Sequence, residues 1–268
     1  MNSINFLMFI YKYFQLFSLS LASEKKIQFL GFSGEPLKQA EDGYSAVGPF
    51  YQVFGSGWQK CTQNTHISCV VTVRADVDFS KQDEWRPLNV TKIEDEIQSQ
   101  VNRHITSQVK IYAWYVLPDE LRPWRKNEMH YLELVSSIIK RNSTKPIISY
   151  NPANREADDL IKMAHLGLDV IAKNAYIEMN TFRDSSLIIK SMNACHKASQ
   201  NNFGRNLQLG VYLKLARDPI NPNDDQFISQ LIRHDVYLSI LKGSLIYLNI
   251  LIFQNKLNYN SKLYTDSV

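Results

Sequence analysis

The sequence lacks the features that mark several large classes of protein. Its 268 residues include only three cysteines, Cys61, Cys69 and Cys195, which is too few for a scaffold held together by disulfides. The 30 basic and 26 acidic residues are spread along the chain, without the cluster of Lys and Arg that a nucleic-acid-binding surface needs. We therefore expect no nucleic-acid partner. No internal repeat stands out, and the length favours one domain.

Several catalytic signatures are also absent. The six histidines are dispersed, with no H-x-x-x-H or H-E-x-x-H spacing, so we expect no metal site. There is no G-x-S-x-G elbow, and Cys195-His196 falls in a stretch with helical spacing, which disfavours a nucleophilic Ser or Cys. No G-x-G-x-x-G follows the first strand candidate, so no dinucleotide cofactor is expected.

The N-terminal segment differs from the rest of the chain. Residues 1–22 consist largely of apolar runs on either side of Lys12, and they end in Ser20-Leu21-Ala22, small residues suited to signal-peptidase cleavage. The segment is therefore predicted to be a secretory signal peptide or, if uncleaved, an N-terminal membrane anchor. Cleavage would make the protein secreted or periplasmic, with residues 23–268 as the mature domain.

In an exported protein, two of the cysteines could form a disulfide. Cys61 and Cys69 lie where a helix end is followed by a strand, a spacing that allows a bridge between them. Three buried thiols are the alternative, because spacing alone does not show that two Cα atoms come close enough.

Beyond the N-terminal segment, short apolar runs alternate with longer amphipathic stretches, which is the pattern of repeated βα units. The eight strand candidates are 28–32, 45–50, 68–73, 110–116, 146–150, 169–177, 207–215 and 244–253. Eight such units in a chain of this size predict an α/β fold of the (β/α)8 TIM-barrel type. The tail after residue 253 is polar, so the barrel could be incomplete or truncated at its C-terminal end.

One helix is especially well marked. Ile93, Ile97, Val101 and Ile105 are spaced four residues apart and predict an apolar stripe that faces the barrel. Thr91 followed by Glu94 has the spacing of a capping box, which would start this helix. Gly167 and Gly243 are placed where later helices would end.

Residues 111–123, IYAWYVLPDELRP, followed by a helix and then KPII, resemble the fourth strand and loop of clan-A-type glycoside hydrolases, the β-galactosidase-like superfamily. Residues 232–243 are similar to that family's last-helix pattern, R-x-x-x-Y-x-x-x-x-x-G. The resemblance implies a TIM barrel in which Glu120 is the general acid/base and Asp119 its neighbour. The family's second carboxylate ends the seventh strand, where this chain has Lys214.

Glycosidic cleavage needs two carboxyl groups, because the leaving oxygen takes a proton while positive charge develops on the sugar. With Lys214 near the expected position, the second group has to come from another strand end. The substitutes are Glu178 after the sixth strand, Asp218 after the seventh, and Asp76 or Asp78 after the third. Alternatively, Glu120 is a solvated acid on the loop, or it forms an ion pair with Arg122 or Arg125.

Other residues at the predicted strand ends suit sugar binding. Aromatic rings stack on pyranose faces, while charged and amide groups bind the hydroxyls. The predicted substrate-binding residues are Tyr115, Trp124, Arg74, Asp76, Asn151 and Tyr176. The sequence therefore favours an exported glycoside hydrolase acting on an oligosaccharide without a cofactor. The alternative is a catalytically degenerate barrel that binds a glycan or a protein.

Overall fold

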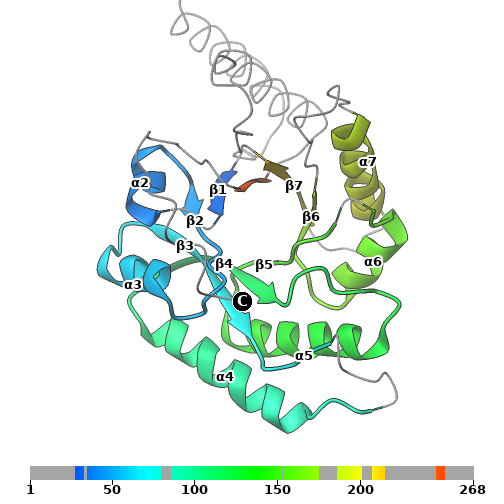
Figure 1. Cartoon of the computed structure of the whole chain (residues 1–268), viewed down its shortest axis with the longest axis horizontal. Coiled ribbons are helices and arrows are strands. Elements are labelled where there is room, and N and C mark those ends of the chain that lie inside the picture. Colours follow the sequence, from blue (N-terminus) through cyan, green and yellow to red (C-terminus); the bar gives the residue numbers. More distant parts are fainter. Residues whose placement is uncertain are drawn as a thin grey trace, which may run out of the picture.

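The computed structural model describes residues 28–32, 35–79, 86–152, 154–174, 186–200, 207–214 and 246–250. Among these residues, eight parallel strands form a closed barrel in the order β1 to β8, with the helices around its outside (Figure 1). The (β/α)8 fold predicted from the sequence is therefore confirmed. The strands are β1 (Gln28–Phe32), β2 (Ala46–Val47), β3 (Ser68–Arg74), β4 (Lys110–Leu117), β5 (Ile147–Ile148), β6 (Val170–Asn174), β7 (Gln208–Lys214) and β8 (Ile246–Ile250). The described helices are α2 (Pro36–Glu41), α3 (Ser56–Gln63), α4 (Val90–Thr106), α5 (Lys126–Asn142), α6 (Ala157–His165) and α7 (Ser186–Gln200).

Strand β8 closes the barrel. It pairs in parallel with β1, from Gln28↔Ile246 to Phe32↔Ile250, and with β7, from Gly210↔Ile246 to Lys214↔Ile250. The predicted truncation concerns the chain after this strand, and residues 251–268 lie outside the described residues. Gly243 and the predicted last helix also lie outside them.

Apolar side chains cover both faces of the strands. Along β4, Ala113 and Tyr115 face the barrel interior, where they pack with Leu30, Val70 and Ala172. Trp114 and Val116 face outward and join the larger core under α4 and α5. A third cluster packs β6 and β7 against α6 and α7. This two-sided burial explains why the strand sequences are almost continuously apolar.

Helix α4 forms as predicted, with two corrections. Ile93, Ile97 and Val101 are buried, but Ile105 is 44% exposed. An α-helix turns about 100° per residue, so the twelfth residue after Ile93 lies roughly 120° from Ile93 around the helix, beyond the edge of the stripe, whereas the eleventh, His104, lies about 20° from it. His104 is the buried residue at this position, with its ring against Trp114.

The second correction concerns the start of α4. The predicted capping box at Thr91 and Glu94 is wrong, because the helix begins at Val90 and its N-cap is Asn89. The Asn89 side chain accepts a hydrogen bond of 3.1 Å from the Lys92 amide. Asn is a preferred N-cap for this reason, since its oxygen satisfies one of the free N–H groups of the first turn. The predicted end of α6 is confirmed by Gly167, which follows the helix with a φ of +132°.

Cys61, near the end of α3, and Cys69, in β3, are joined by a disulfide with their Cα atoms 6.6 Å apart. Both residues are buried, and Cys195 in α7 is a buried free thiol. The disulfide ties the loop between α3 and β3 to the barrel wall.

The predicted signal peptide or anchor at residues 1–22 lies outside the described residues. In the part of the chain that is described, no helix combines the length and the apolar character needed to cross a bilayer.

Candidate active site

The carboxyl ends of β3, β4 and β5 border a pocket of about 720 Å³. In a (β/α)8 barrel this end of the strands carries the functional groups, because the βα loops meet there. The polar and aromatic residues that line the pocket are Arg74, Asp76, Asp78, Phe79, Asp119, Glu120, Arg122, Trp124, Glu128, Asn154 and Arg155. The structure therefore brings together five predicted site residues, Arg74, Asp76, Asp119, Glu120 and Trp124, and one substitute acid, Asp78.

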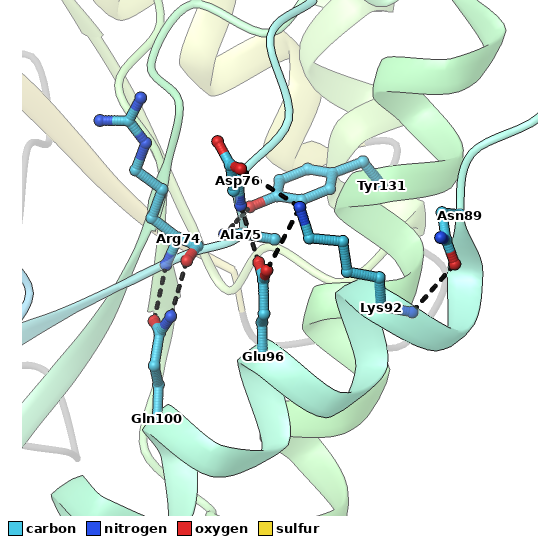
Figure 2. A network of polar contacts seen from close by, with 8 residues as sticks. All are labelled: Arg74, Ala75, Asp76, Asn89, Lys92, Glu96, Gln100 and Tyr131. Atoms are coloured by element: carbon cyan, nitrogen blue, oxygen red, sulfur yellow. Dashed lines mark hydrogen bonds and ion pairs between the residues drawn. The ribbon is translucent and has the colours of Figure 1, made fainter.

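Side chains of α4 and α5 fix the backbone at the end of β3 (Figure 2). The Gln100 amide binds both polar groups of Arg74: its oxygen accepts from the Arg74 N–H at 2.9 Å, and its nitrogen donates to the Arg74 carbonyl at 2.7 Å. The Ala75 N–H donates to the Tyr131 hydroxyl at 3.1 Å. That hydroxyl in turn donates to the Leu117 carbonyl at 2.6 Å, so Tyr131 links the ends of β3 and β4.

Asp76 completes this network through its backbone N–H and its exposed carboxylate. Its N–H donates to Glu96 at 2.8 Å, and its carboxylate lies 3.2 Å from the Lys92 ammonium. Lys92 also approaches Glu96 at 3.6 Å, and the hydrogen bond to Asp76 raises the pKa of Lys92. The predicted substrate-binding role of Asp76 would therefore compete with an ion pair on the α4 side of the loop.

Asp119, in the loop after β4, is a half-buried carboxyl group. The Tyr115 hydroxyl donates to its Oδ1 at 2.6 Å. Burial raises the pKa of Asp119 from 3.8 to about 6; the Tyr115 hydrogen bond opposes the rise and the charge of Glu120 adds to it. Asp119 can therefore hold a proton at mildly acidic pH, which is the property a general acid needs.

Glu120 has different surroundings from its neighbour. Its side chain is exposed at the pocket, and its backbone lies in the left-handed region with a φ of +57°. The Arg155 guanidinium holds this turn, since its Nη2 donates to the carbonyls of Glu120 at 3.1 Å and Leu121 at 2.8 Å. Arg122 and Glu128 hold the following residues by an ion pair of 2.5 Å.

Two exposed aromatic rings flank these acids. Tyr51, after β2, is 58% exposed; partial burial is the largest cause of its raised pKa, and the charges of Asp119 and Glu120 add to the rise. Trp124 is 64% exposed, and its ring lies 4.7 Å from the Arg155 guanidinium carbon. Among the exposed large apolar side chains of the described residues, these two are the aromatic ones. Both are placed where a sugar could stack.

Tyr115 and Asn151 do not occupy the positions predicted for sugar contacts. Tyr115 is 1% exposed, with its ring inside the barrel, so the ring is not available to a sugar. Its hydroxyl instead donates a hydrogen bond to the Asp119 carboxyl. Asn151 is buried, and its amide nitrogen donates to the carbonyls of Ser149 at 3.2 Å and Ala172 at 2.9 Å, which joins β5 to β6. Adjacent strand residues alternate between faces, but sequence cannot say how deep an inward side chain lies.

Three of the predicted acid and aromatic positions, Tyr176, Glu178 and Asp218, lie outside the described residues. Lys214 is the last residue of β7, which ends one residue before the predicted limit at residue 215. Within the described part of the chain, no group of three His, Cys, Asp or Glu side chains is arranged to hold a metal ion.

Arg155 is the main site residue that the sequence did not single out. It follows β5 and is 3% exposed, and Lys173 of β6 donates to its carbonyl. The one signal in the sequence was its place on the predicted loop, because neither its burial nor its contact with Trp124 follows from residue type.

No protein-family model matches this chain, and no curated protein matches it in sequence. Solved structures resemble it in fold. A glucosidase from Croceicoccus marinus has a TM-score of 0.53 at 11% identity, covering 73% of this chain and 44% of the glucosidase. The carboxyl transferase domain of Rhizobium etli pyruvate carboxylase, with pyruvate and biocytin, has a TM-score of 0.51 at 10% identity, covering 86% of this chain and 40% of that one. The chain spans less than half of either structure, and the similarity is to the barrel fold of these enzymes.

Proposed function

We propose that the protein is a glycoside hydrolase whose site is the pocket at the ends of β3, β4 and β5. The observation that carries the proposal is Asp119, a half-buried carboxyl with a pKa of about 6 beside the exposed carboxylate of Glu120. Asp119 would donate a proton to the glycosidic oxygen, and Glu120 would stabilise the positive charge that develops on the sugar. This assignment moves the acid role from Glu120 to its neighbour.

The surroundings of the two acids support a sugar substrate. Trp124 lines the pocket with Asp119 and Glu120 and offers an exposed ring. Tyr51, which is also exposed, lines a separate hollow after β2 but is near enough to feel the charges of both acids. A volume of about 720 Å³ is in the range of small-ligand sites, and its lining mixes ring faces with charged groups. We propose an oligosaccharide as the partner.

We also propose that the protein is exported. The apolar segment at residues 1–22 and the Cys61–Cys69 disulfide support this, because disulfides persist in secreted and periplasmic proteins and are rare in the cytosol.

Purified protein assayed against a panel of 4-nitrophenyl glycosides tests the activity. Asp119→Asn and Glu120→Gln should each lower kcat/KM by about 10²-fold or more, because each removes a carboxyl group that the transition state uses. Asp158→Asn, an exposed acid on α6, is the matched control and should leave the rate unchanged. Equal rates for the wild type and both site variants would reject the hydrolase.

A second function, glycan binding without turnover, is favoured by Lys214. It ends β7, where the family that the sequence resembles has its second carboxylate. A glycan array distinguishes the two: glycans that are retained but never cleaved would assign the barrel to binding, whereas release of reducing sugar would assign it to hydrolysis.

A further inference from the structure

Three arginines line the pocket, and they differ in their partners. Arg122 is paired with Glu128 through its Nη2 at 2.5 Å and its Nε at 2.7 Å. For Arg74 and Arg155, no acidic side chain of the described residues lies within ion-pair distance. Neither guanidinium therefore makes a direct ion pair in this part of the chain, although the charges of Asp159, Glu120 and Glu128 act on Arg155 from further away.

Arg155 is the more unusual of the two because it is buried. Its Nη2 bonds two backbone carbonyls, yet no acceptor among the described residues meets its Nε–H. The ring of Trp124 lies against the guanidinium. Buried charges are ordinarily paired, since removing an ion from water is costly. A ligand anion would supply the missing partner.

Arg74 is exposed, but its position is unusually well defined. Gln100 holds both its N–H and its carbonyl, and the next two residues are held by Tyr131 and Glu96. Figure 2 shows the guanidinium directed away from these α4 and α5 side chains. Fixing the backbone in advance lowers the entropy lost when the side chain binds a ligand.

The acids of the pocket set the orientation of a charged ligand. The lining also carries Asp76, Asp78 and Glu128, of which Asp76 is paired with Lys92 and Glu128 with Arg122. Asp119 and Glu120 repel an anionic group, whereas Arg74 and Arg155 attract it, so the anionic end of a ligand is expected beside the two arginines. Trp124, beside Arg155, offers its ring to a pyranose.

We infer that the pocket takes an acidic sugar, with Arg74 and Arg155 binding its carboxylate and Trp124 stacking on its ring. This names the substrate class of the proposed hydrolase, but binding itself does not require cleavage.

A glycan array that contains neutral, uronate-containing and sulfated oligosaccharides tests the inference. The expected result is retention of carboxylate-bearing glycans that is weakened by salt and abolished when the carboxylates are methyl-esterified. Retention of neutral glycans alone, or of none, overturns it. Retention of sulfated glycans alone also overturns the carboxylate assignment, because it would show that the arginines bind sulfate.

Variants then test the two residues. Arg74→Gln should weaken binding of the retained uronate glycan by about tenfold or more, because it removes a charge-assisted hydrogen bond. Arg155→Gln should do the same, but its side chain is buried and the variant could fail to fold, so Arg74→Gln is the decisive one. Arg141→Gln, exposed in the last turn of α5 at the opposite end of the barrel, removes the same charge and should have no effect. Equal losses in Arg74→Gln and Arg141→Gln would reject a specific site.

The outcomes separate this inference from the hydrolase. Asp119-dependent cleavage of neutral glycosides with no binding of uronates would overturn the inference but leave the hydrolase in place. Arginine-dependent uronate binding without cleavage would sink the hydrolase and leave the acidic-glycan site in place.

Discussion

Asp119 and Glu120 are neighbours in sequence but have different surroundings, and the difference arises from individual contacts. The acidic turn after β4 could be found from the sequence, because it follows an aromatic strand and precedes a helix. The sequence could not rank the two acids. Asp119 is half-buried and bonded to a tyrosine inside the barrel, whereas Glu120 adopts a positive φ that keeps its side chain exposed.

The raised pKa of Asp119 predicts a trade-off between stability and function. Between its ordinary value of 3.8 and its folded value of about 6, the folded protein binds more protons at this group than the unfolded chain does. Stability is therefore lost as pH rises through this window. Asp119→Asn, which resembles the protonated acid, should be more stable than the wild type at pH 7, by up to about 3 kcal/mol.

Urea unfolding at several pH values measures this effect. The difference between Asp119→Asn and the wild type should shrink towards zero as pH falls to 4, while Asp158→Asn should show no such trend. A variant that is less stable than the wild type at pH 7, or a gap that does not change with pH, would contradict the raised pKa.

At the scale of elements, the strands were easier to predict than their lengths. Every observed strand except β3 and β4 lies within its predicted range, and those two extend one residue further. Strand β2 ends after two residues because the next residue, Gly48, has a φ of +93° and leaves the extended conformation. A side chain does not fit at this position, since an added Cβ would lie 2.6 Å from the Val70 carbonyl oxygen. Strand β5 begins after Pro146, which has no N–H to donate to the ladder. Contacts between strands, which sequence does not show, set these limits.

The junction of β3 and α4 shows how an element positions the site. Gln100 offers its amide to both polar groups of Arg74, much as another strand would, and so orders the loop that carries Arg74 and Asp76. A half-buried glutamine beside the apolar stripe of α4 gave no sign of this role in the sequence, since its partner lies 26 residues away.

Gln100→Ala should lower the free energy of unfolding by about 1–2 kcal/mol, because two hydrogen bonds at a partly exposed position are lost. Gln98→Ala, on the same helix, is the control: Gln98 bonds only other side chains, Asn102 at 2.8 Å and Asn142 at 3.4 Å. Urea unfolding with an unchanged m-value measures both. A Gln100→Ala variant as stable as the wild type would show that the Gln100 contacts do not stabilise the fold.

At the scale of the whole molecule, local sequence patterns predicted the βα units but not the strand pairing that closes the barrel. Alternating apolar runs indicated eight βα units, and eight units in a chain of this size predicted a barrel. Closure itself depends on β8 pairing with β1, between residues more than 200 positions apart in the chain, and no local pattern encodes that register. The same holds for the pocket, whose lining comes from three loops.

The disulfide connects the fold to the proposed export, and all three cysteines of the chain can be tested together. Cys61 and Cys69 close a short loop, so replacing both by Ala should lower the free energy of unfolding by about 2–3 kcal/mol. Burial raises the pKa of Cys195 to about 12, so its thiol should resist alkylation in the folded protein.

Mass spectrometry after iodoacetamide treatment therefore has a defined expected pattern. Protein produced in an oxidising compartment should take up no label when folded, one when unfolded without reductant, and three when unfolded with reductant. The double Ala variant should take up one label when unfolded, whether or not reductant is present. Three labels on unreduced wild-type protein would show that the two cysteines are free thiols in the protein as it is made, and would remove the strongest support for an exported hydrolase.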